Sequence, residues 1–289
     1  MTSIRTTLRN ASARLAEAGV ASPEHDARAL AAHALGLAGP DDVALVEDLD
    51  ADQAAAFEDL VSRRVQRVPL QHLLGRARFR DLELEVGPGV FVPQPETGPV
   101  VQWTVDALRG VPQPLCVDLC TGSGAIALAL AHEVPGARVH AVELNPDSLV
   151  WTRRNVASRV AAGDPEVLLH QGDAEQALPE LDGRLDLVVS NPPYVATGEA
   201  HIPTPEVLDH DPGVALWAGE DGLDVIRLVE RAARRLLRPG GLLVVEHSSR
   251  QGATAPALLQ ATGGWNEVED HRDDEGHDRF VTARWTPEG

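Results

Sequence analysis

Residues 115–124 read Leu-Cys-Val-Asp-Leu-Cys-Thr-Gly-Ser-Gly, and an Ala- and Leu-rich run follows at 125–134. The first five residues are a short apolar run typical of a buried strand, and the later run is typical of a helix. The glycines between them allow a tight turn that a ligand can approach closely, because no side chain blocks the backbone. This unit predicts an α/β fold with a ligand site at the end of its first strand.

The rest of the C-terminal region continues the alternation of strands and helices. We expect strands at 137–144, 166–173, 184–191 and 240–247, helices at 146–160 and about 223–237, and a final pair of strands at 265–268 and 279–285. Strands that alternate with helices form a mixed, mostly parallel, doubly wound sheet, and ligands bind such a sheet at the carboxyl ends of its strands.

The N-terminal region has a different pattern. Residues 1–74 carry Ala and Leu at three- and four-residue spacing, which predicts a small, entirely helical bundle. Alternating runs at 82–86 and 89–92, around Gly87-Pro88-Gly89, predict a β-hairpin. We therefore expect a helical domain at 1–74, a hairpin linker at 75–97 and an α/β domain at 98–289.

The charge of the chain restricts its partners. Its 289 residues include 44 acidic and 25 basic residues, for a formal net charge of -19. Phosphate backbones repel such a balance at long range, so we expect no direct binding to nucleic acid. One local exception is a run without acidic residues that contains Arg63, Arg64, Arg67, Arg76, Arg78 and Arg80. We interpret it first as a solvated face and second as a docking surface for an acidic or RNA-containing partner.

Other features concern location and metals. Cys116 and Cys120 are too few for a disulfide scaffold. No apolar run approaches the roughly 20 residues that span a bilayer, and charges stand where a signal peptide has its apolar segment. We expect a cytoplasmic monomer without membrane contact. No Cys and His spacing matches a zinc site, so we also expect no metal.

Acidic residues at strand ends indicate the ligand. Glu143 lies nineteen residues after Gly124, at the end of the second strand, where a carboxylate accepts hydrogen bonds from ribose hydroxyls. Asp173 ends the next strand and is placed to meet an adenine edge. Ala127 occupies the place of the third glycine in the dinucleotide fingerprint, so the turn is closer to the S-adenosylmethionine type than to the nicotinamide type.

The loop Asn191-Pro192-Pro193-Tyr194 indicates the reaction. Two prolines fix the backbone and leave a rigid carbonyl acceptor at Pro192, and the Asn191 side chain supplies a second acceptor. Two acceptors aimed at one point suit an NH2 group, and the Tyr194 ring can pack on the planar group that bears it. Fixed acceptors raise the electron density of an otherwise weakly nucleophilic amide or exocyclic amine. The loop therefore predicts methyl transfer to such a nitrogen.

These motifs resemble those of the protein-(glutamine-N5) methyltransferases of the HemK/PrmC type, which modify peptide chain release factors. The resemblance covers nearly the whole chain and rests on residues 91–97, 118–124, 191–194, Glu143, and Glu246-His247 with Arg279. It implies a class I, Rossmann-like methyltransferase domain after a helical substrate-docking domain. It also implies S-adenosylmethionine as the methyl donor and class I release factors as partners.

The resemblance and the residue patterns together give one set of site residues. The cofactor would be bound by Asp118, Cys120, Thr121, Gly122, Ser123, Gly124, Glu143, Asp173, Ala174 and Asn191. The glutamine of the Gly-Gly-Gln motif would be held by Asn191, Pro192, Pro193 and Tyr194. Of these four, Asn191, Pro192 and Tyr194 are the expected catalytic residues.

Two departures from the family pattern leave alternatives open. The family reads Pro-Arg-Pro-Glu-Thr-Glu, whereas this chain has Gln94 and Gly98 in place of the arginine and the second acid. A paralogue that methylates another protein glutamine is one alternative. An adenine-N6 type methyltransferase acting on nucleic acid is a second, because it shares the Asn191 loop. A non-enzymatic adenosine binder is a third, although it would not need that loop.

Overall fold

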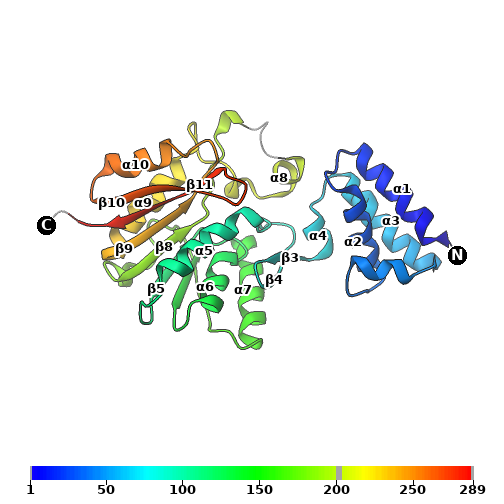
Figure 1. The fold of residues 1–289 in the computed structure, drawn as a ribbon, viewed down its shortest axis with the longest axis horizontal. Coiled ribbons are helices and arrows are strands. Elements are labelled where there is room, and N and C mark those ends of the chain that lie inside the picture. The colour runs from blue at the N-terminus through cyan, green and yellow to red at the C-terminus, as the bar shows by residue number, and fades with distance from the viewer. Residues whose placement is uncertain (1, 200–203, 288–289) are drawn as a thin grey trace. The chain divides into compact units, whose positions relative to one another are not determined.

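The computed structural model describes residues 2–199 and 204–287, which fall into two compact units (Figure 1). Unit 1 contains the described residues up to Arg76 together with helix α8 (Pro205–His210). Unit 2 contains the described residues from Ala77 onward, apart from the α8 segment. We expected residues 98–289 to form one domain, and the α8 segment differs from that expectation because it packs with the helices of unit 1.

Unit 1 is built mainly from helices. Their bounds are α1 (Ile4–Glu17), α2 (Pro23–Ala34), α3 (Ala51–Val65) and α4 (Leu70–Leu74). Two short strands, β1 (Thr2–Ser3) and β2 (Asp48–Leu49), pair antiparallel, so the prediction of an entirely helical region was wrong in this detail. Helix α3 begins at a capping box, in which Asp50 and Gln53 each accept a hydrogen bond from the other's backbone N–H.

Two arginines of the basic run, Arg64 and Arg67, form ion pairs inside unit 1. Arg64 is only 6% exposed, and its Nε lies 2.8 Å from Oδ2 of Asp26. Arg64 and Arg67 also pair with Glu206 of α8, at 2.9 and 2.6 Å. Arg64 and Arg67 are therefore part of neither a solvated face nor a docking surface, because acidic residues distant in the sequence neutralise them.

The β-hairpin lies earlier in the chain than we expected. Its strands are β3 (Arg76–Phe79) and β4 (Leu82–Glu85), joined at Arg80 and Asp81. A turn is present at Gly87-Pro88-Gly89, where the Val90 N–H donates to the Gly87 carbonyl at 3.3 Å, but residues 89–92 do not form a strand, so the predicted hairpin around this turn was wrong. Val86, Val90 and Val92 are instead buried beside Trp151. The physical reason is that this packing against Trp151 takes up the segment after Gly87, so residues 76–79 pair with residues 82–85 in its place.

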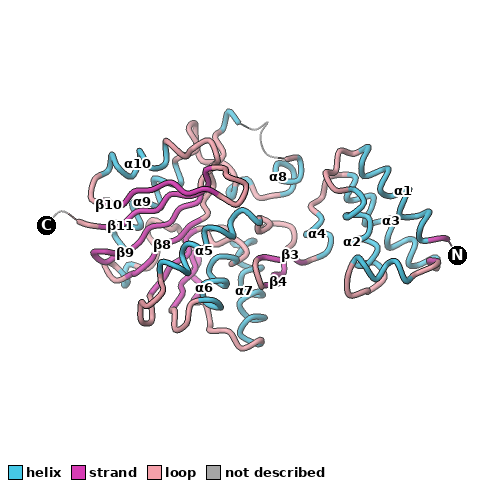
Figure 2. Tube along the Cα trace, in the orientation of Figure 1, coloured by secondary structure: helices cyan, strands magenta, loops and turns pink. Residues whose placement is uncertain are grey.

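A seven-stranded sheet is found within the described part of unit 2, in the order β10-β11-β9-β8-β5-β6-β7. Its strands are β5 (Leu115–Leu119), β6 (Arg138–Glu143), β7 (Leu168–Gln171), β8 (Leu185–Ser190), β9 (Leu237–Glu246), β10 (Trp265–Arg272) and β11 (Asp278–Trp285). Strands β5 to β9 are parallel where they pair, and β11 and β10 add an antiparallel edge. The predicted mixed, mostly parallel sheet is confirmed. Figure 2 shows its strands in magenta with the helices in cyan.

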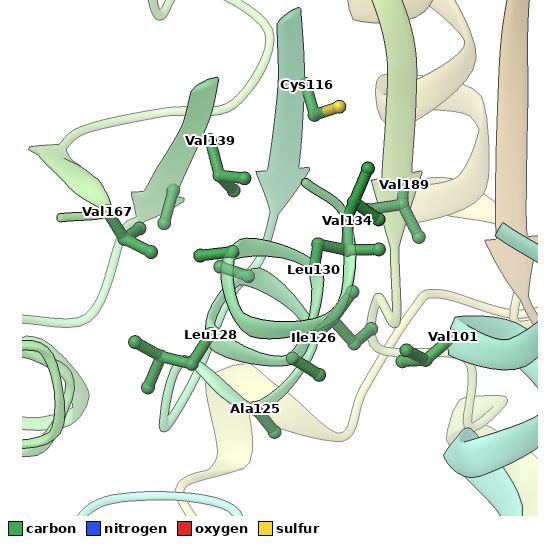
Figure 3. Packing of buried hydrophobic residues seen from close by; sticks show 14 of the residues in the cluster. Val101, Cys116, Ala125, Ile126, Leu128, Leu130, Val134, Val139, Val167 and Val189 are labelled. Carbon is green, nitrogen blue, oxygen red and sulfur yellow. The ribbon is translucent and has the colours of Figure 1, made fainter. Parts of the chain in front are cut away.

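Helices cover both faces of this sheet. On one face lie α5 (Gly98–Ala107), α6 (Ala125–Glu133) and α7 (Pro146–Ala161), and on the other lie α9 (Asp224–Leu236) and α10 (Thr254–Thr262). Alternate residues of β5 face opposite layers, since Cys116 packs with α6 and Val117 packs with α9. Figure 3 shows the first of these cores, in which α6 contributes Ile126 and Leu130. No helix among the described residues is long and apolar enough to span a bilayer.

Strand order determines where the site lies. β5 pairs with β6 on one side and with β8 on the other, so the chain leaves β5 toward one edge and later returns to the opposite side. Such a reversal opens a crevice at the carboxyl ends of the strands. The loops after β5, β6 and β8 meet at this crevice, and they carry the residues that the sequence singled out.

Candidate active site

The loop after β5 is a tight turn with three residues in the left-handed region. The φ angles are 60° at Cys120, 57° at Gly122 and 86° at Gly124. A Cβ added at Gly124 would lie 2.8 Å from Cγ2 of Thr152, so glycine is required there for packing. A Cβ at Gly122 would meet no atom within 4 Å. Gly122 therefore faces open space, where a ligand can approach the backbone.

Side chains beneath the loop hold it in place. The Asp118 side chain is fully buried, and its Oδ2 accepts hydrogen bonds from Thr121 Oγ1 at 2.5 Å and from the Ala127 N–H at 3.2 Å. From α7, Thr152 Oγ1 donates to the Gly122 carbonyl at 2.6 Å, and Asn155 Nδ2 donates to the Ser123 carbonyl at 3.0 Å. These contacts preorganise the turn before any ligand binds.

Burial changes the acidity of Asp118. It raises the pKa of this carboxyl to about 7, although hydrogen bonds from Thr121 and Ala127 oppose the shift. Its Oδ1 atom has no hydrogen-bond partner among the described residues. Asp118 therefore supports the loop from below, with no surface left for direct contact with a ligand.

Glu143, at the end of β6, faces the loop. Its Oε2 accepts a hydrogen bond from the Gly122 N–H at 2.8 Å, and its Oε1 accepts one from the Asn145 N–H at 2.7 Å. Burial raises the pKa of Glu143, while these backbone hydrogen bonds lower it. A carboxylate has about four acceptor positions, so these backbone donors leave acceptor capacity for a hydroxyl donor such as that of a ribose.

Asp173 and Ala174 follow β7, the neighbour of β6. Gln171 pairs with Glu143, and the Gly172 N–H donates to the Glu143 carbonyl at 3.0 Å. The Asp173 carboxylate is exposed and accepts from the Glu175 N–H at 2.9 Å, whereas Ala174 is buried. The strand pairing thus brings both residues to the same edge of the sheet as Glu143.

The loop after β8 lies beside the loop after β5. Ser190 pairs with Leu119, and its Oγ donates to the Leu119 carbonyl at 2.6 Å. This pairing places Asn191 next to Cys120. Pro192 and Pro193 are buried. No described residue donates a backbone hydrogen bond to the Pro192 carbonyl, which therefore remains available as an acceptor.

A contact with Thr97 fixes the Asn191 side chain. Its Nδ2 donates to Thr97 Oγ1 at 3.2 Å, across 94 residues of sequence. The NH2 group of the amide is therefore turned toward Thr97, and Oδ1 has no donor among the described residues. Because Thr97 is 4% exposed, this contact is sheltered from water. The arrangement leaves Asn191 Oδ1 as an acceptor beside Pro192.

Tyr194 lies in a cluster of buried polar groups. Burial raises its pKa, and the charge of Glu246 acts in the same direction, whereas Arg279 opposes both. The Glu246 side chain is 1% exposed. Arg279 also pairs with Asp273 at 2.9 Å. Neutral Tyr194 can present its ring to a planar group.

The structure brings the predicted site residues together at one end of the sheet. Sequence reasoning missed Thr97, Thr152 and Asn155, which hold the two loops. Thr97 lies in the Pro-Glu-Thr segment that the resemblance had singled out, so a partial signal was present. Thr152 and Asn155 are polar positions on the buried side of a helix, which is a recognisable pattern once the burial is known.

Two family models and several curated relatives match this chain. Residues 6–75 match the model of the PrmC N-terminal domain, and residues 100–208 match that of the methyltransferase small domain. The chain is 55% identical to the Release factor glutamine methyltransferase of Streptomyces coelicolor over 277 residues, or 95% of each chain. It is 48% identical to the protein of the same name from Mycolicibacterium smegmatis, over 98% of each chain.

The chain belongs to the release factor glutamine methyltransferase family. It is an S-adenosylmethionine-dependent methyltransferase, as the two loops predicted. The family resemblance inferred from the sequence is therefore confirmed. Another relative has a different printed activity: the 4-amino-L-phenylalanine/4-methylamino-L-phenylalanine methyltransferase of Streptomyces pristinaespiralis is 43% identical over 90% of this chain and 88% of its own length.

Solved structures support the fold of this family member. The catalytic domain of hMettl16, in complex with an RNA hairpin, aligns with a TM-score of 0.58 at 17% identity, covering 80% of this chain and 83% of that one. The T. thermophilus 16S rRNA N2 G1207 methyltransferase RsmC aligns with a TM-score of 0.53 at 22% identity, covering 73% and 49%. At these identities the likeness concerns the fold alone.

Proposed function

We propose that this chain transfers a methyl group from S-adenosylmethionine to the side-chain amide nitrogen (N5) of the glutamine in the Gly-Gly-Gln motif of class I release factors. The observation that carries the proposal is the Asn191 amide, which Thr97 orients so that Oδ1 is free beside the Pro192 carbonyl. The relatives of nearly full length named as release factor glutamine methyltransferases support the substrate. Modification of the release factor would support translation termination.

The loop after β5 fits the cofactor. Gly122 faces open space, and Glu143 keeps acceptor capacity for the ribose hydroxyls. Cys120 and Gly122 have accessible surface in the loop, whereas Asp118, Thr121 and Ser123 are buried and support it. Asp173 and Ala174 would line the adenine side. When bound, S-adenosylmethionine supplies an electrophilic methyl group on a sulfonium sulfur.

The loop after β8 would activate and orient the amide. Asn191 Oδ1 and the Pro192 carbonyl each accept one N–H of the substrate NH2, which raises electron density on nitrogen and favours pyramidal geometry. Tyr194 packs against the amide plane and limits its rotation. Alignment of this kind can supply roughly 7–11 kcal/mol of barrier reduction in favourable cases. No general base would be needed before attack, because the N–H would become acidic only as the nitrogen–methyl bond forms and the methyl–sulfur bond breaks. S-adenosylhomocysteine would be the leaving group, and the N–H proton would pass to water.

The family departures do not remove this chemistry. Gln94 Nε2 donates to the Val92 carbonyl at 2.9 Å, so the side chain is engaged in its own loop. A Cβ at Gly98 would meet no atom within 4 Å. Both positions therefore alter the neighbourhood of the site without touching Asn191.

The remaining parts of the proposal concern partners and location. We expect a cytoplasmic monomer whose partner is a protein, because release factors act in translation. Direct binding to nucleic acid is disfavoured by the net charge of -19. The basic run adds little to such binding, since Arg64 and Arg67 are neutralised by Asp26 and Glu206.

A methylation assay with mass-spectrometric detection tests the proposal. Purified class I release factor, 4-amino-L-phenylalanine, DNA and ribosomal RNA are offered separately with S-adenosylmethionine. We expect one methyl group on the Gly-Gly-Gln glutamine and none elsewhere, and loss of this product with Asn191→Ala. Methylation of the amino acid or of nucleic acid alone, with the release factor unmodified, would contradict the proposal.

A further inference from the structure

Glu246 is a buried carboxyl group at the edge of the substrate loop. It is the last residue of β9, and Val245 before it pairs with Ser190, the residue before Asn191. The side chain is 1% exposed, and its Oε2 has no hydrogen-bond partner among the described residues. A buried carboxyl with an unsatisfied oxygen carries a free-energy cost, so its position calls for a functional reason.

Two groups that position the substrate loop contact this carboxyl. Hydrogen bonding by Thr97 and by Tyr194 each lowers the pKa of Glu246, so both side chains lie beside this carboxyl. Arg279 lies close enough to favour the ionised form, whereas Glu96 disfavours it. Burial raises the pKa of Glu246 to about 7, so the carboxylate form is available at neutral and higher pH.

The contact with Thr97 determines the direction of a chain of hydrogen bonds. A threonine hydroxyl has one proton to donate. Asn191 Nδ2 donates to Thr97 Oγ1 at 3.2 Å, so the hydroxyl proton is free to be donated to Glu246. Above about pH 7 Glu246 is ionised and can only accept, so the chain then runs from Asn191 through Thr97 to Glu246. In this direction Asn191 must present its oxygen, not its NH2, to the substrate.

A reversed chain would turn the amide around. If residue 246 could donate to Thr97, the hydroxyl could donate to Asn191 Oδ1 instead. Asn191 would then present its NH2 group to the substrate NH2, and two donors would face each other. The methyl acceptor would lose one of the two contacts that orient it.

We propose that the Thr97 hydroxyl donates to the buried Glu246 carboxylate, and that Glu246 is thereby a positioning residue that sets the direction of the Asn191–Thr97–Glu246 hydrogen bonds and holds Asn191 Oδ1 as the acceptor for the substrate amide. This inference rests on the proposed function, because it assigns a role to Glu246 in the recognition of the glutamine NH2. Tyr194, which lies in the same loop as Asn191, also lowers the pKa of this carboxyl by hydrogen bonding.

Steady-state kinetics of wild-type enzyme, Glu246→Gln, Thr97→Val and Thr97→Ser, with a release factor as substrate, tests the inference. Glutamine at 246 has the shape of glutamate but can donate. We expect Glu246→Gln and Thr97→Val each to lower kcat by about 10- to 100-fold, with the S-adenosylmethionine Kd unchanged in calorimetry. Thr97→Ser keeps the hydroxyl and should retain a kcat close to that of wild type.

A double variant and a matched control separate positioning from stability. Combining Glu246→Gln with Thr97→Val should lower kcat no further than the more damaging single change, because both break one chain. The control is Glu230→Gln, which removes another buried carboxylate. Glu230 lies on α9 and accepts a hydrogen bond from Trp265 Nε1 at 2.9 Å. We expect it to lower Tm and leave kcat unchanged.

Several results would overturn the inference. These are an unchanged kcat in Glu246→Gln, multiplied losses in the double variant, or an equal loss of cofactor affinity. If Glu246→Gln does not fold, Thr97→Val is the deciding variant. A kcat equal to that of wild type in Thr97→Val would then contradict the inference. If wild-type enzyme leaves the release factor unmethylated, the proposed function fails instead, so the two failures are distinguishable.

Discussion

Asn191 is held from one side by Thr97 and is open on the other, and this asymmetry makes it an acceptor. Replacing it with alanine removes the acceptor and leaves one substrate N–H without a partner. We expect Asn191→Ala to lower kcat/KM by an amount equivalent to roughly 1–3 kcal/mol or more. The S-adenosylmethionine Kd, measured by calorimetry, should stay within about twofold. A parallel loss of cofactor affinity would remove Asn191 from the role of substrate acceptor.

A substitution at Glu143 should weaken cofactor binding and leave turnover nearly unchanged, the opposite of Asn191→Ala. In Glu143→Gln one oxygen is replaced by an NH2 group, which cannot accept from the N–H of Gly122 or of Asn145. The loop contact weakens, and the remaining acceptor positions for the ribose are reduced. We expect the S-adenosylmethionine Kd to rise about tenfold or more, while kcat at saturating cofactor changes little. An unchanged calorimetric titration would place the ribose elsewhere.

The pKa of Asp118 gives a prediction about pH. Its folded pKa of about 7 is raised above the ordinary value for an aspartate, so below pH 7 the folded state binds a proton that the unfolded state does not. Stability from this group therefore increases as the pH falls from 8 toward 5. In urea unfolding, wild type should gain about 2 kcal/mol relative to Asp118→Asn between pH 8 and pH 5.5. Parallel pH curves for the two proteins would contradict the shift.

At the scale of elements, the β5–α6 turn depends on contact with α7. Gly124→Ala would combine a φ of 86° with a Cβ placed 2.8 Å from Thr152 Cγ2. We expect a loss of about 2 kcal/mol or more in the free energy of unfolding, measured by urea denaturation.

Gly163→Ala is the matched control for this change. Gly163 also has a positive φ, 100°, but a Cβ there would meet no atom within 4 Å. The substitution should lower the free energy of unfolding by about 1 kcal/mol, because only the backbone strain at positive φ contributes. Equal losses in the two variants would mean that the packing against Thr152 contributes nothing.

At the scale of the whole molecule, α8 is tied to the helices of unit 1 through charge. Burial opposes ionisation of Glu206, but the hydrogen bonds from Arg67 and Arg64 outweigh it and lower its pKa to about 2. Because this pKa is lowered, the contribution of Glu206 to stability is fully present above about pH 4.5 and is lost progressively as the pH falls from about 4.5 through about 2.

Removal of the Glu206 charge should therefore destabilise unit 1 at neutral pH. Glu206→Gln leaves Arg67 without an anionic partner and Arg64 with Asp26 alone. We expect a loss of about 3 kcal/mol in the free energy of unfolding, since a mostly buried ion pair is broken from one side. Hydrogen exchange should show faster exchange in α3, and the loss should be constant between pH 8 and pH 5. An unchanged exchange rate in α3 would mean that the ion pairs of Glu206 with Arg64 and Arg67 make no net contribution to stability.

The sequence by itself determined the features that depend on neighbouring residues. The run 115–124 contains its own strand, its own glycine turn and the start of its own helix, so the fold class and the cofactor loop followed from local pattern. The Asn191 loop was recognisable for the same reason, since two prolines restrict the backbone wherever they occur. Strand alternation also indicated a parallel sheet, which placed Glu143 at the correct edge.

Only the tertiary structure decided the contacts between distant residues. The hairpin turn lies at Arg80 rather than at Gly87, because Trp151 buries the segment that the local pattern predicted as a strand. Thr97 meets Asn191 across 94 residues, and Arg64 meets Glu206 across 142. Such pairs form because strand order and helix packing bring their backbones together. The direction of the Asn191 amide was therefore determined by packing, although the amide itself was evident from the sequence.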